Sequence, residues 1–172
     1  MTLPLPPPRT KFEDAHLGQT VWLQNIDRLL SLAPRPRGEV WMDVGCGDGT
    51  AMAYTALEHS QFSQVIGFDV DHSMVELATQ RFKMLPEPAR GKLSAVQCDA
   101  ARFIVPPRPL FLFLFNPFGP GTARAFLANN LASMKAHKSV ILLANDHLLP
   151  VFEPVAVHIR QDPKWNLSVV CL

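Results

Sequence analysis

The sequence is poor in cysteine, and its three cysteines, Cys46, Cys98 and Cys171, are odd in number and far apart. They form no Cys-x-x-Cys pair, so we expect neither a disulfide framework nor a cysteine metal site. No His-Glu-x-x-His or comparable spacing occurs either, and we therefore expect no bound metal. This sparse use of cysteine favours a reducing compartment and predicts a cytoplasmic protein.

The sequence also lacks an excess of charge of one sign, because 16 Lys and Arg face 15 Asp and Glu. This balance gives no electrostatic case for a nucleic-acid or membrane partner. Long hydrophobic runs are missing too, since the longest, Leu110–Phe115, is far too short to cross a bilayer. Prolines in Leu3–Pro8 stand where the apolar core of a secretory signal would be, so residues 1–10 are expected to form a polyproline II tail.

What the sequence does contain is an alternation of apolar strand patterns with helical patterns. A chain of 172 residues that is 48% hydrophobic is expected to form one domain that buries roughly two thirds of its surface. Helices are predicted to begin near Thr20 and Thr50, at Asp71 or Ser73, and at Thr122. Strands are predicted over residues 39–44, 65–69, 93–98, 110–115 and 139–144, followed by a hairpin of residues 154–160 and 165–172.

This order of elements predicts an α/β fold with a doubly wound, mostly parallel seven-stranded sheet. Helices would cover both faces, and the C-terminal hairpin would add an antiparallel edge. The uninterrupted apolar run Leu110–Phe115 is typical of a central parallel strand that is buried on both faces. Residues 11–37 are expected to form an N-terminal helical cap, and residues 38–172 the main domain.

The first predicted strand runs into a loop with glycine at every second position, Gly45, Gly47 and Gly49. Glycine allows a sharp turn and lets a ligand approach the backbone N–H and C=O groups. The helix that begins near Thr50 would direct its free amides and the positive end of its dipole at that ligand. The segment therefore predicts a site for a nucleoside cofactor.

The glycine spacing differs from that of a dinucleotide fingerprint, in which glycines occupy the first, third and sixth positions. Here the sixth position is Thr50, and Asp43 lies in the strand two residues before the first glycine. The pattern Asp-x-Gly-x-Gly-x-Gly resembles the first motif of the class I S-adenosylmethionine-dependent methyltransferases. The alternative is a glycine-rich turn in another α/β protein. The resemblance extends over most of residues 38–172, and the predicted order of strands is similar to the seven-stranded methyltransferase fold.

The resemblance implies a cofactor, S-adenosyl-L-methionine, and assigns residues to it. Asp69, at the end of the second strand, would accept hydrogen bonds from the ribose hydroxyls, and Asp99, at the end of the third, from the adenine amino group. For both, capping or turn formation is the alternative. Asp43 would hold the loop or reach the methionyl amine through water, and Cys46 fills a variable loop position. Apolar walls for the base are assigned to Val70, Ala100 and Ala101.

The fourth strand ends in Asn116-Pro117-Phe118-Gly119. This resembles the Asn-Pro-Pro-aromatic motif of methyltransferases that act on nitrogen, although Phe118 replaces the second proline. The resemblance assigns catalytic roles to Asn116, Pro117 and Phe118: two acceptors orient the target amino group, the proline fixes the backbone between them, and the ring stacks on the acceptor. Asn116 would also contact the cofactor. The alternative is a turn that only ends the strand.

The resemblance thus implies an S-adenosylmethionine-dependent methyltransferase that acts on a nitrogen of an unidentified acceptor, either a small molecule or a protein. Asp146 and His147 follow the fifth strand near the expected site and are weaker candidates for orienting the acceptor or taking its proton. Two other classes of protein remain open. One is a binding-only or partner-regulating protein of the same fold, and the other is a nicotinamide-dependent oxidoreductase, which the glycine spacing disfavours. The fold is also shared by aminopropyltransferases, but no paired acidic residues suited to a polyamine are evident.

Overall fold

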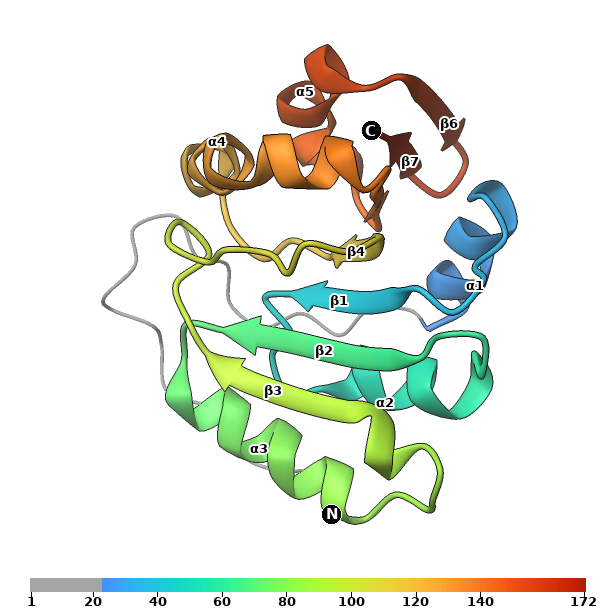
Figure 1. Ribbon diagram of the computed structural model, residues 1–172, viewed down its shortest axis with the longest axis vertical. Helices are drawn as coiled ribbons and strands as arrows, with labels where there is room; N and C mark the ends of the chain where they lie inside the picture. The colour runs from blue at the N-terminus through green and yellow to red at the C-terminus, as the bar shows by residue number, and fades with distance from the viewer. Residues whose placement is uncertain (1–22) are drawn as a thin grey trace.

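The computed structural model describes residues 23–172. The predicted proline-rich tail of residues 1–10 and the predicted helix start at Thr20 lie outside the described residues. The centre of the molecule is one seven-stranded sheet with the strand order β3-β2-β1-β4-β5-β7-β6 (Figure 1). The strands are β1 (Val40–Val44), β2 (Gln64–Asp69), β3 (Leu93–Gln97), β4 (Leu110–Leu114), β5 (Val140–Leu143), β6 (His158–Asp162) and β7 (Leu167–Cys171).

Strands β1 to β5 are parallel to one another, and β7 pairs antiparallel with both β5 and β6. The prediction of a mostly parallel sheet with an antiparallel C-terminal hairpin is therefore confirmed. The helices are α1 (Gln24–Leu32), α2 (Thr50–Glu58), α3 (His72–Lys83), α4 (Pro120–Ala136) and α5 (Leu149–Phe152), and the short 3-10 turns are η1 (Arg90–Lys92), η2 (Asp146–Leu148) and η3 (Glu153–Val155).

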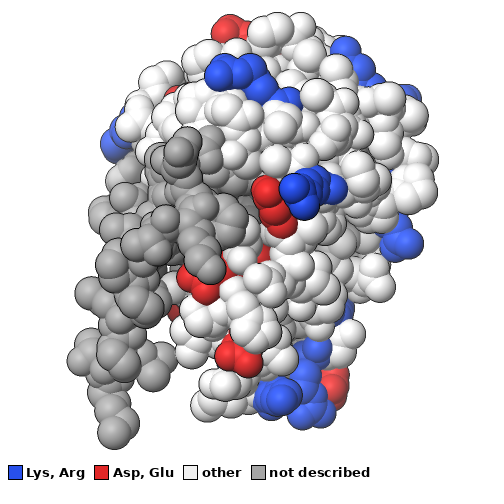
Figure 2. Space-filling model, turned by 90° about the vertical axis from the view of Figure 1, so that its left-hand side faces the viewer, with Lys and Arg blue, Asp and Glu red and all other residues white. Residues whose placement is uncertain are grey.

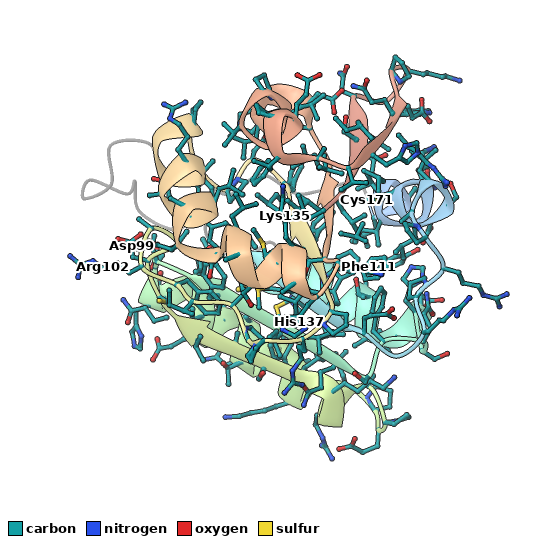
Figure 3. The ribbon with its side chains drawn as sticks, turned by 45° about the horizontal axis from the view of Figure 1, so that its top comes forward. Asp99, Arg102, Phe111, Lys135, His137 and Cys171 are labelled. Carbon is teal, nitrogen blue, oxygen red and sulfur yellow. The ribbon has the colours of Figure 1, made fainter. Side chains whose placement is uncertain are left out.

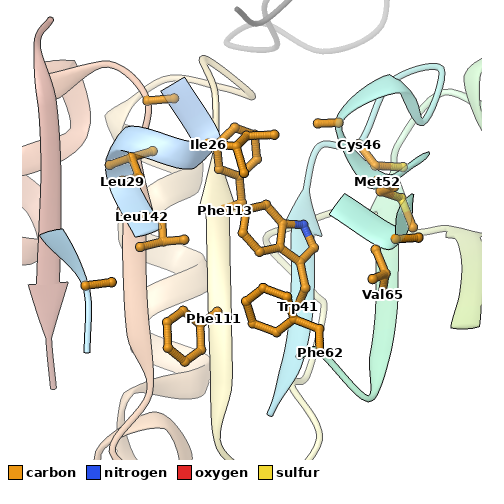
Figure 4. Packing of buried hydrophobic residues seen from close by; sticks show 14 of the residues in the cluster. Ile26, Leu29, Trp41, Cys46, Met52, Phe62, Val65, Phe111, Phe113 and Leu142 are labelled. Carbon is orange, nitrogen blue, oxygen red and sulfur yellow. The ribbon is translucent and has the colours of Figure 1, made fainter. Parts of the chain in front are cut away.

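The two central strands, β1 and β4, are buried along their whole length. Alternation along a strand sends successive side chains to opposite faces of the sheet. On one face Trp41 of β1 stacks on Phe113 of β4, with ring centroids 5.1 Å apart (Figure 4). On the other face Met42 and Leu112 are fully buried. The uninterrupted apolar run of β4 is thus explained by burial on both sides, as predicted.

Helices cover both faces of the sheet and form two separate hydrophobic clusters. Buried residues of α1, α2 and α3 pack with Trp41 and Phe113, whereas those of α4 and α5, among them Phe126 and Phe152, pack with Met42 on the opposite face. Helix α1 belongs to the first cluster, because Ile26 and Leu29 are fully buried against the sheet (Figure 4). The part of the predicted N-terminal cap that precedes residue 23 lies outside the described residues.

The predicted start of α3 is confirmed, whereas that of α4 is wrong. Asp71 caps α3, since its side chain accepts a hydrogen bond of 2.9 Å from the backbone N–H of Ser73. The predicted start of the fourth helix at Thr122 is wrong, because α4 begins at Pro120 with Gly119 as N-cap. Proline suits the first helical turn, where its missing N–H would have no partner within the helix and its fixed φ is already helical.

The hairpin is shorter than predicted at its first strand. Its residues 153–155 form the 3-10 turn η3, and β6 begins only at His158. Pro154 lies in that turn and cannot donate to a strand ladder, which accounts for the later start. In residues 23–172 no helix is both long enough and apolar enough to cross a membrane.

Because β1 to β5 are parallel, their carboxyl ends all meet at one edge of the sheet. The arrowheads of β1, β2 and β3 point to this edge on the left of Figure 1. In open sheets of this kind ligands bind at the carboxyl ends, next to the point where the strand order reverses. Here the order reverses between β1 and β4, so a ligand site is expected at the segments that follow these two strands.

Candidate active site

The glycine loop after β1 is tied to the end of β2. The backbone N–H groups of Gly45 and Cys46 both donate to the carbonyl oxygen of Phe68, at 2.9 Å each. Gly45, Gly47 and Gly49 have φ values of 76°, 52° and 74°, in the left-handed region that favours glycine. The alternation of glycines seen in the sequence is therefore required by the path of the loop.

The three glycines face different surroundings. A Cβ on Gly45 would lie 2.5 Å from the Cβ of Pro117, and one on Gly49 would lie 2.8 Å from the Cβ of Ala78 on α3. No atom of residues 23–172 lies within 4 Å of the position that a Cβ on Gly47 would take. Gly45 and Gly49 thus permit close packing, whereas Gly47 presents backbone that no other part of the described chain covers, as a ligand-binding loop requires.

Asp69 lies at the carboxyl end of β2 and is bonded to the glycine loop. Its Oδ2 accepts a 2.9 Å hydrogen bond from the N–H of Gly47, and its Oδ1 accepts one of 2.9 Å from the N–H of Asp71. The side chain is almost fully buried, with 3% exposure. Since a carboxylate has about four acceptor positions, these backbone bonds are compatible with further bonds from sugar hydroxyls.

Asp43 is buried in β1 directly beneath the loop. Its Oδ2 has no hydrogen-bond partner among the described residues, and the residue is 3% exposed. Burial raises the pKa of Asp43 from 3.8 to about 8, with smaller contributions from the nearby charges of Asp69 and Asp48. An unsatisfied buried carboxyl is costly to stability and is typical of functional sites.

Two other loop residues have structural roles. The Asp48 side chain accepts hydrogen bonds from the N–H and hydroxyl of Thr50 and forms a 2.6 Å ion pair with Arg81 of α3. Arg81 was not among the predicted residues, because no local pattern links it to a loop 33 positions earlier. Burial, followed by the charge of Asp43, raises the pKa of the Cys46 thiol far above its usual range, so this cysteine is not a nucleophile.

The part of the site that is predicted to bind adenine is formed by the segments after β2 and β3. Asp99 forms a turn, because its Oδ1 accepts a 2.9 Å hydrogen bond from the N–H of Ala101. Ala100 is buried in the core on the side of α4, so its methyl group packs inward. Val70 and Ala101 are half-buried and are the apolar side chains left to contact a base. The adenine role of Asp99 stays a prediction.

The turn after β4 lies directly against the glycine loop. Asn116 adopts a left-handed φ of 46° and is half-buried, and Pro117 is buried beside Gly45. Phe118 is only 5% exposed and belongs to the hydrophobic cluster on the side of α4. Its burial gives the ring a packing role, and the predicted stacking of this ring on an acceptor gains no support from the structure.

The segment after β5 reaches the same edge. His147 places its Nε2 at 3.3 Å from the carbonyl oxygen of Phe118. Asp146 accepts a 2.6 Å hydrogen bond from the hydroxyl of Ser168, a fully buried residue of β7. Ser168 was not predicted, although a lone serine within the apolar run 167–170 was a signal for such a buried bond.

The face at the carboxyl ends has a mixed electrostatic character. Asp and Glu side chains lie mainly in its middle part, and most Lys and Arg side chains lie toward its rim (Figure 2). Asp99 and Arg102 lie together at one side of this edge, away from Lys135 and His137 near the C-terminal end of α4 (Figure 3). Within the described part of the chain, no group of three His, Cys, Asp or Glu is arranged to hold a metal.

A seven-stranded sheet of this order, with a glycine loop and an acid after β2, defines a Rossmann-like methyltransferase fold. The family model described as "Methyltransferase domain" matches residues 42–136, more than half of the chain. The protein therefore belongs to the class I S-adenosylmethionine-dependent methyltransferases. Membership of this family does not establish a role for the Asn-Pro-Phe turn.

Solved structures show the same fold at low sequence identity. The methyltransferase domain of a bacterial protein, CtHen1-C, has a TM-score of 0.63 and 17% identity, with 87% of this chain and 97% of that one covered. An RNA methyltransferase from Salinibacter ruber in complex with S-adenosyl-L-homocysteine has a TM-score of 0.53 and 17% identity, with 85% and 87% covered.

The StiE O-MT structure has a TM-score of 0.60 and 15% identity, with 81% of this chain covered. The match spans only 52% of that longer chain. No curated protein matches the sequence significantly. At these identities the solved structures establish the fold, and the reaction and the acceptor have to be argued from the residues of this chain.

Proposed function

We propose that the protein uses S-adenosyl-L-methionine to methylate a nitrogen atom of its acceptor. The observation that carries the cofactor assignment is the 2.9 Å hydrogen bond between the N–H of Gly47 and Oδ2 of Asp69. It joins the glycine loop to a buried acid on the neighbouring strand, and those are the two groups that a nucleoside needs for its backbone and ribose contacts.

The residues at the edge of the sheet fit the chemical groups of this cofactor. Asp69 would accept from the ribose hydroxyls, and Asp99 from the adenine amino group. Asp43 has a buried oxygen without a partner among the described residues, and a methionyl ammonium group or a bridging water would supply one. On the side of Gly47, no atom from the described part of the chain would obstruct a ligand that approaches the backbone.

Asn116 and the carbonyl group of Pro117 would orient the acceptor nitrogen. The proposal is supported by the direct contact of Pro117 with Gly45, which holds the turn and the cofactor loop in one fixed relation. When bound, the cofactor supplies a methyl group that its sulfonium has already activated. The protein then contributes mainly in-line positioning, together with acceptors for the N–H groups of the substrate.

The acceptor itself is proposed to be neutral or cationic, either a small amine or a protein side chain. The net charge of +1 and the acidic side chains in the middle of the face support this choice over a polyanion (Figure 2). The RNA methyltransferase among the solved structures shares only the fold at 17% identity, and it carries no argument for an RNA substrate here.

Isothermal titration calorimetry of the full chain with S-adenosyl-L-homocysteine and with NAD tests the cofactor. We expect saturable heat with the first and none with NAD, and the reverse result would overturn the proposal. Transfer of a radiolabelled methyl group to a panel of amines and proteins then tests catalysis. Binding without transfer to any acceptor would favour the alternative of a binding-only protein with the same fold.

A further inference from the structure

The connection from β3 to β4, residues 98–109, crosses one face of the sheet without a helix of its own. It carries Asp99, the residue assigned above to the adenine amino group. Local backbone bonds give the segment one short turn, formed by Arg102 N–H to Asp99 O at 3.0 Å and Phe103 N–H to Ala100 O at 3.3 Å, and one bond near its end, from Arg108 N–H to Pro106 O at 2.8 Å. Its position must therefore be fixed by contacts with other elements.

Asn130 of α4 holds this connection through hydrogen bonds to its backbone. It is 1% exposed, and its Oδ1 accepts a 2.8 Å hydrogen bond from the N–H of Val105. Its Nδ2 donates to the carbonyl of Phe103 at 2.8 Å and to that of Phe126 at 2.9 Å. A buried amide in the middle of a helix is unfavourable unless it is satisfied in this way.

Asn129, the preceding residue, holds the connection closer to Asp99. Its Nδ2 donates a 2.7 Å hydrogen bond to the carbonyl of Ala101, whereas the residue itself is exposed. The N–H of Ala101 orients the Asp99 carboxylate, and Asn129 binds the carbonyl of the same residue. Asn129 therefore holds the peptide group next to the one that contacts Asp99.

The same connection is linked to the glycine loop through Phe68. The ring of Phe103 stacks on that of Phe68, with centroids 4.0 Å apart and planes at 13°. The carbonyl of Phe68 accepts from Gly45 and Cys46. Ring stacking thus holds the end of the turn at Phe103 against β2. The two asparagines hold the backbone at Ala101 and Val105 against α4.

We propose that Asn129 and Asn130 are positioning residues for base recognition, which together set the selectivity of the site for adenine through Asp99. The inference rests on the proposed function, because it takes the ligand to be an adenine nucleoside. Without the Asn129 bond the carbonyl of Ala101 loses its partner, so the residue whose N–H binds the Asp99 carboxylate is held less firmly. The carboxylate then loses part of its alignment with the exocyclic amino group of the base.

Asn129→Ala is the decisive variant, because it removes one bond at an exposed position and should leave the fold intact. Lys135→Ala is the matched control, an exposed residue of the same helix that lies away from Asp99 (Figure 3). Each protein is titrated with S-adenosyl-L-homocysteine and with its inosine analogue, in which a 6-oxo group replaces the amino group that Asp99 would bind.

We expect the wild type and Lys135→Ala to prefer the adenine compound. In Asn129→Ala this preference should fall by about threefold to tenfold, the effect of one hydrogen bond, at an unchanged midpoint of thermal unfolding. Asn130→Asp, which keeps the acceptor and loses the donors, should reduce the same preference. An unchanged preference in Asn129→Ala would overturn this inference alone, whereas a wild type that binds neither compound would overturn the proposed function as well.

Discussion

Gly45 and Pro117 are in such close contact that a Cβ atom on Gly45 would lie 2.5 Å from the Cβ of Pro117. The glycine loop after β1 and the turn after β4 are therefore held against each other at the point where the strand order reverses. In the proposed reaction, one segment contacts the methyl donor and the other the acceptor. Their direct packing fixes the relative position of the two, which is the main contribution of an enzyme to methyl transfer from an activated donor.

Replacement of Gly45 by alanine is expected to disrupt both segments. A side chain at φ 76° costs about 1–2 kcal/mol, and overpacking against Pro117 adds about 1–3 kcal/mol. Urea denaturation should show this loss, and calorimetry should show weaker binding of S-adenosyl-L-homocysteine. Gly38→Ala is the control, because Gly38 has a φ of 97° and, among the described residues, no atom lies within 4 Å of the position of a Cβ there. Equal effects of the two substitutions on cofactor binding would contradict the role of the Gly45–Pro117 contact.

Asp69→Asn is expected to weaken the binding of S-adenosyl-L-homocysteine by about tenfold or more, because charge-assisted hydrogen bonds to ribose hydroxyls become neutral ones. Asp71→Asn is a closely matched control two residues away. Asparagine is as good an N-cap as aspartate, so α3 and cofactor affinity should be preserved. Titration calorimetry of both variants checks this, and similar affinities for the two would show that Asp69 is only a turn residue.

Asp43→Asn is expected to stabilise the protein in a pH-dependent way. Because the pKa of Asp43 is raised from 3.8 to about 8, the unfolded chain releases this proton above pH 4 while the folded chain retains it. Folding is thus disfavoured by about 1.4 kcal/mol for each pH unit between these values. The stability advantage of the variant should be small near pH 4 and should grow to a few kcal/mol by pH 8.

Urea denaturation of the wild type and Asp43→Asn at pH 5 and pH 7.5 measures this difference, with Asp71→Asn as a second reference. If the free energies of unfolding of the wild type and Asp43→Asn differ by the same amount at pH 5 and pH 7.5, Asp43 has an ordinary pKa. Cofactor affinity should fall in Asp43→Asn even though the fold is more stable, since asparagine cannot become the charged acceptor that a methionyl ammonium group would favour beside it.

Asn116→Gly is expected to reduce methyl transfer by about a hundredfold, far more than it weakens the binding of S-adenosyl-L-homocysteine, because one of two acceptors that position the substrate nitrogen is lost. Glycine is chosen since Asn116 has a left-handed φ of 46° that glycine adopts without cost. Asn166→Gly, with a φ of 52° in the turn between β6 and β7, is the matched control. Full turnover by Asn116→Gly would remove the catalytic role of this residue.

The succession of strands and helices along the chain, and the presence of helices on both faces of the sheet, could be predicted because each element has its own local pattern. The apolar run of β4 and the glycines after β1 reflect burial on both faces and a left-handed loop path, and both constraints act within a few residues. The predicted start of α4 at Thr122 was wrong because two local signals competed. The proline at the first helical position outweighed a possible side-chain cap.

Some features of the site could not be predicted, because they depend on residues far apart in the sequence. The burial of Phe118, the ion pair of Asp48 with Arg81 and the bond of Ser168 to Asp146 all arise from packing between separate elements. No local pattern carries their geometry. The hydrogen bonds of Asn129 and Asn130 to the β3–β4 connection belong to the same group.

The sequence by itself determined the fold class, the position of the glycine loop and the positions of the carboxylates within β1, at the end of β2 and after β3. These depend on the periodicity of apolar residues and on the backbone freedom of glycine, which are properties of short segments. Only the tertiary structure decided that Gly45 touches Pro117, that Oδ2 of Asp43 is buried without a partner among the described residues and that Phe118 faces the core. Such contacts follow from how distant segments pack around the sheet, and burial, pKa and access to a ligand depend on that packing.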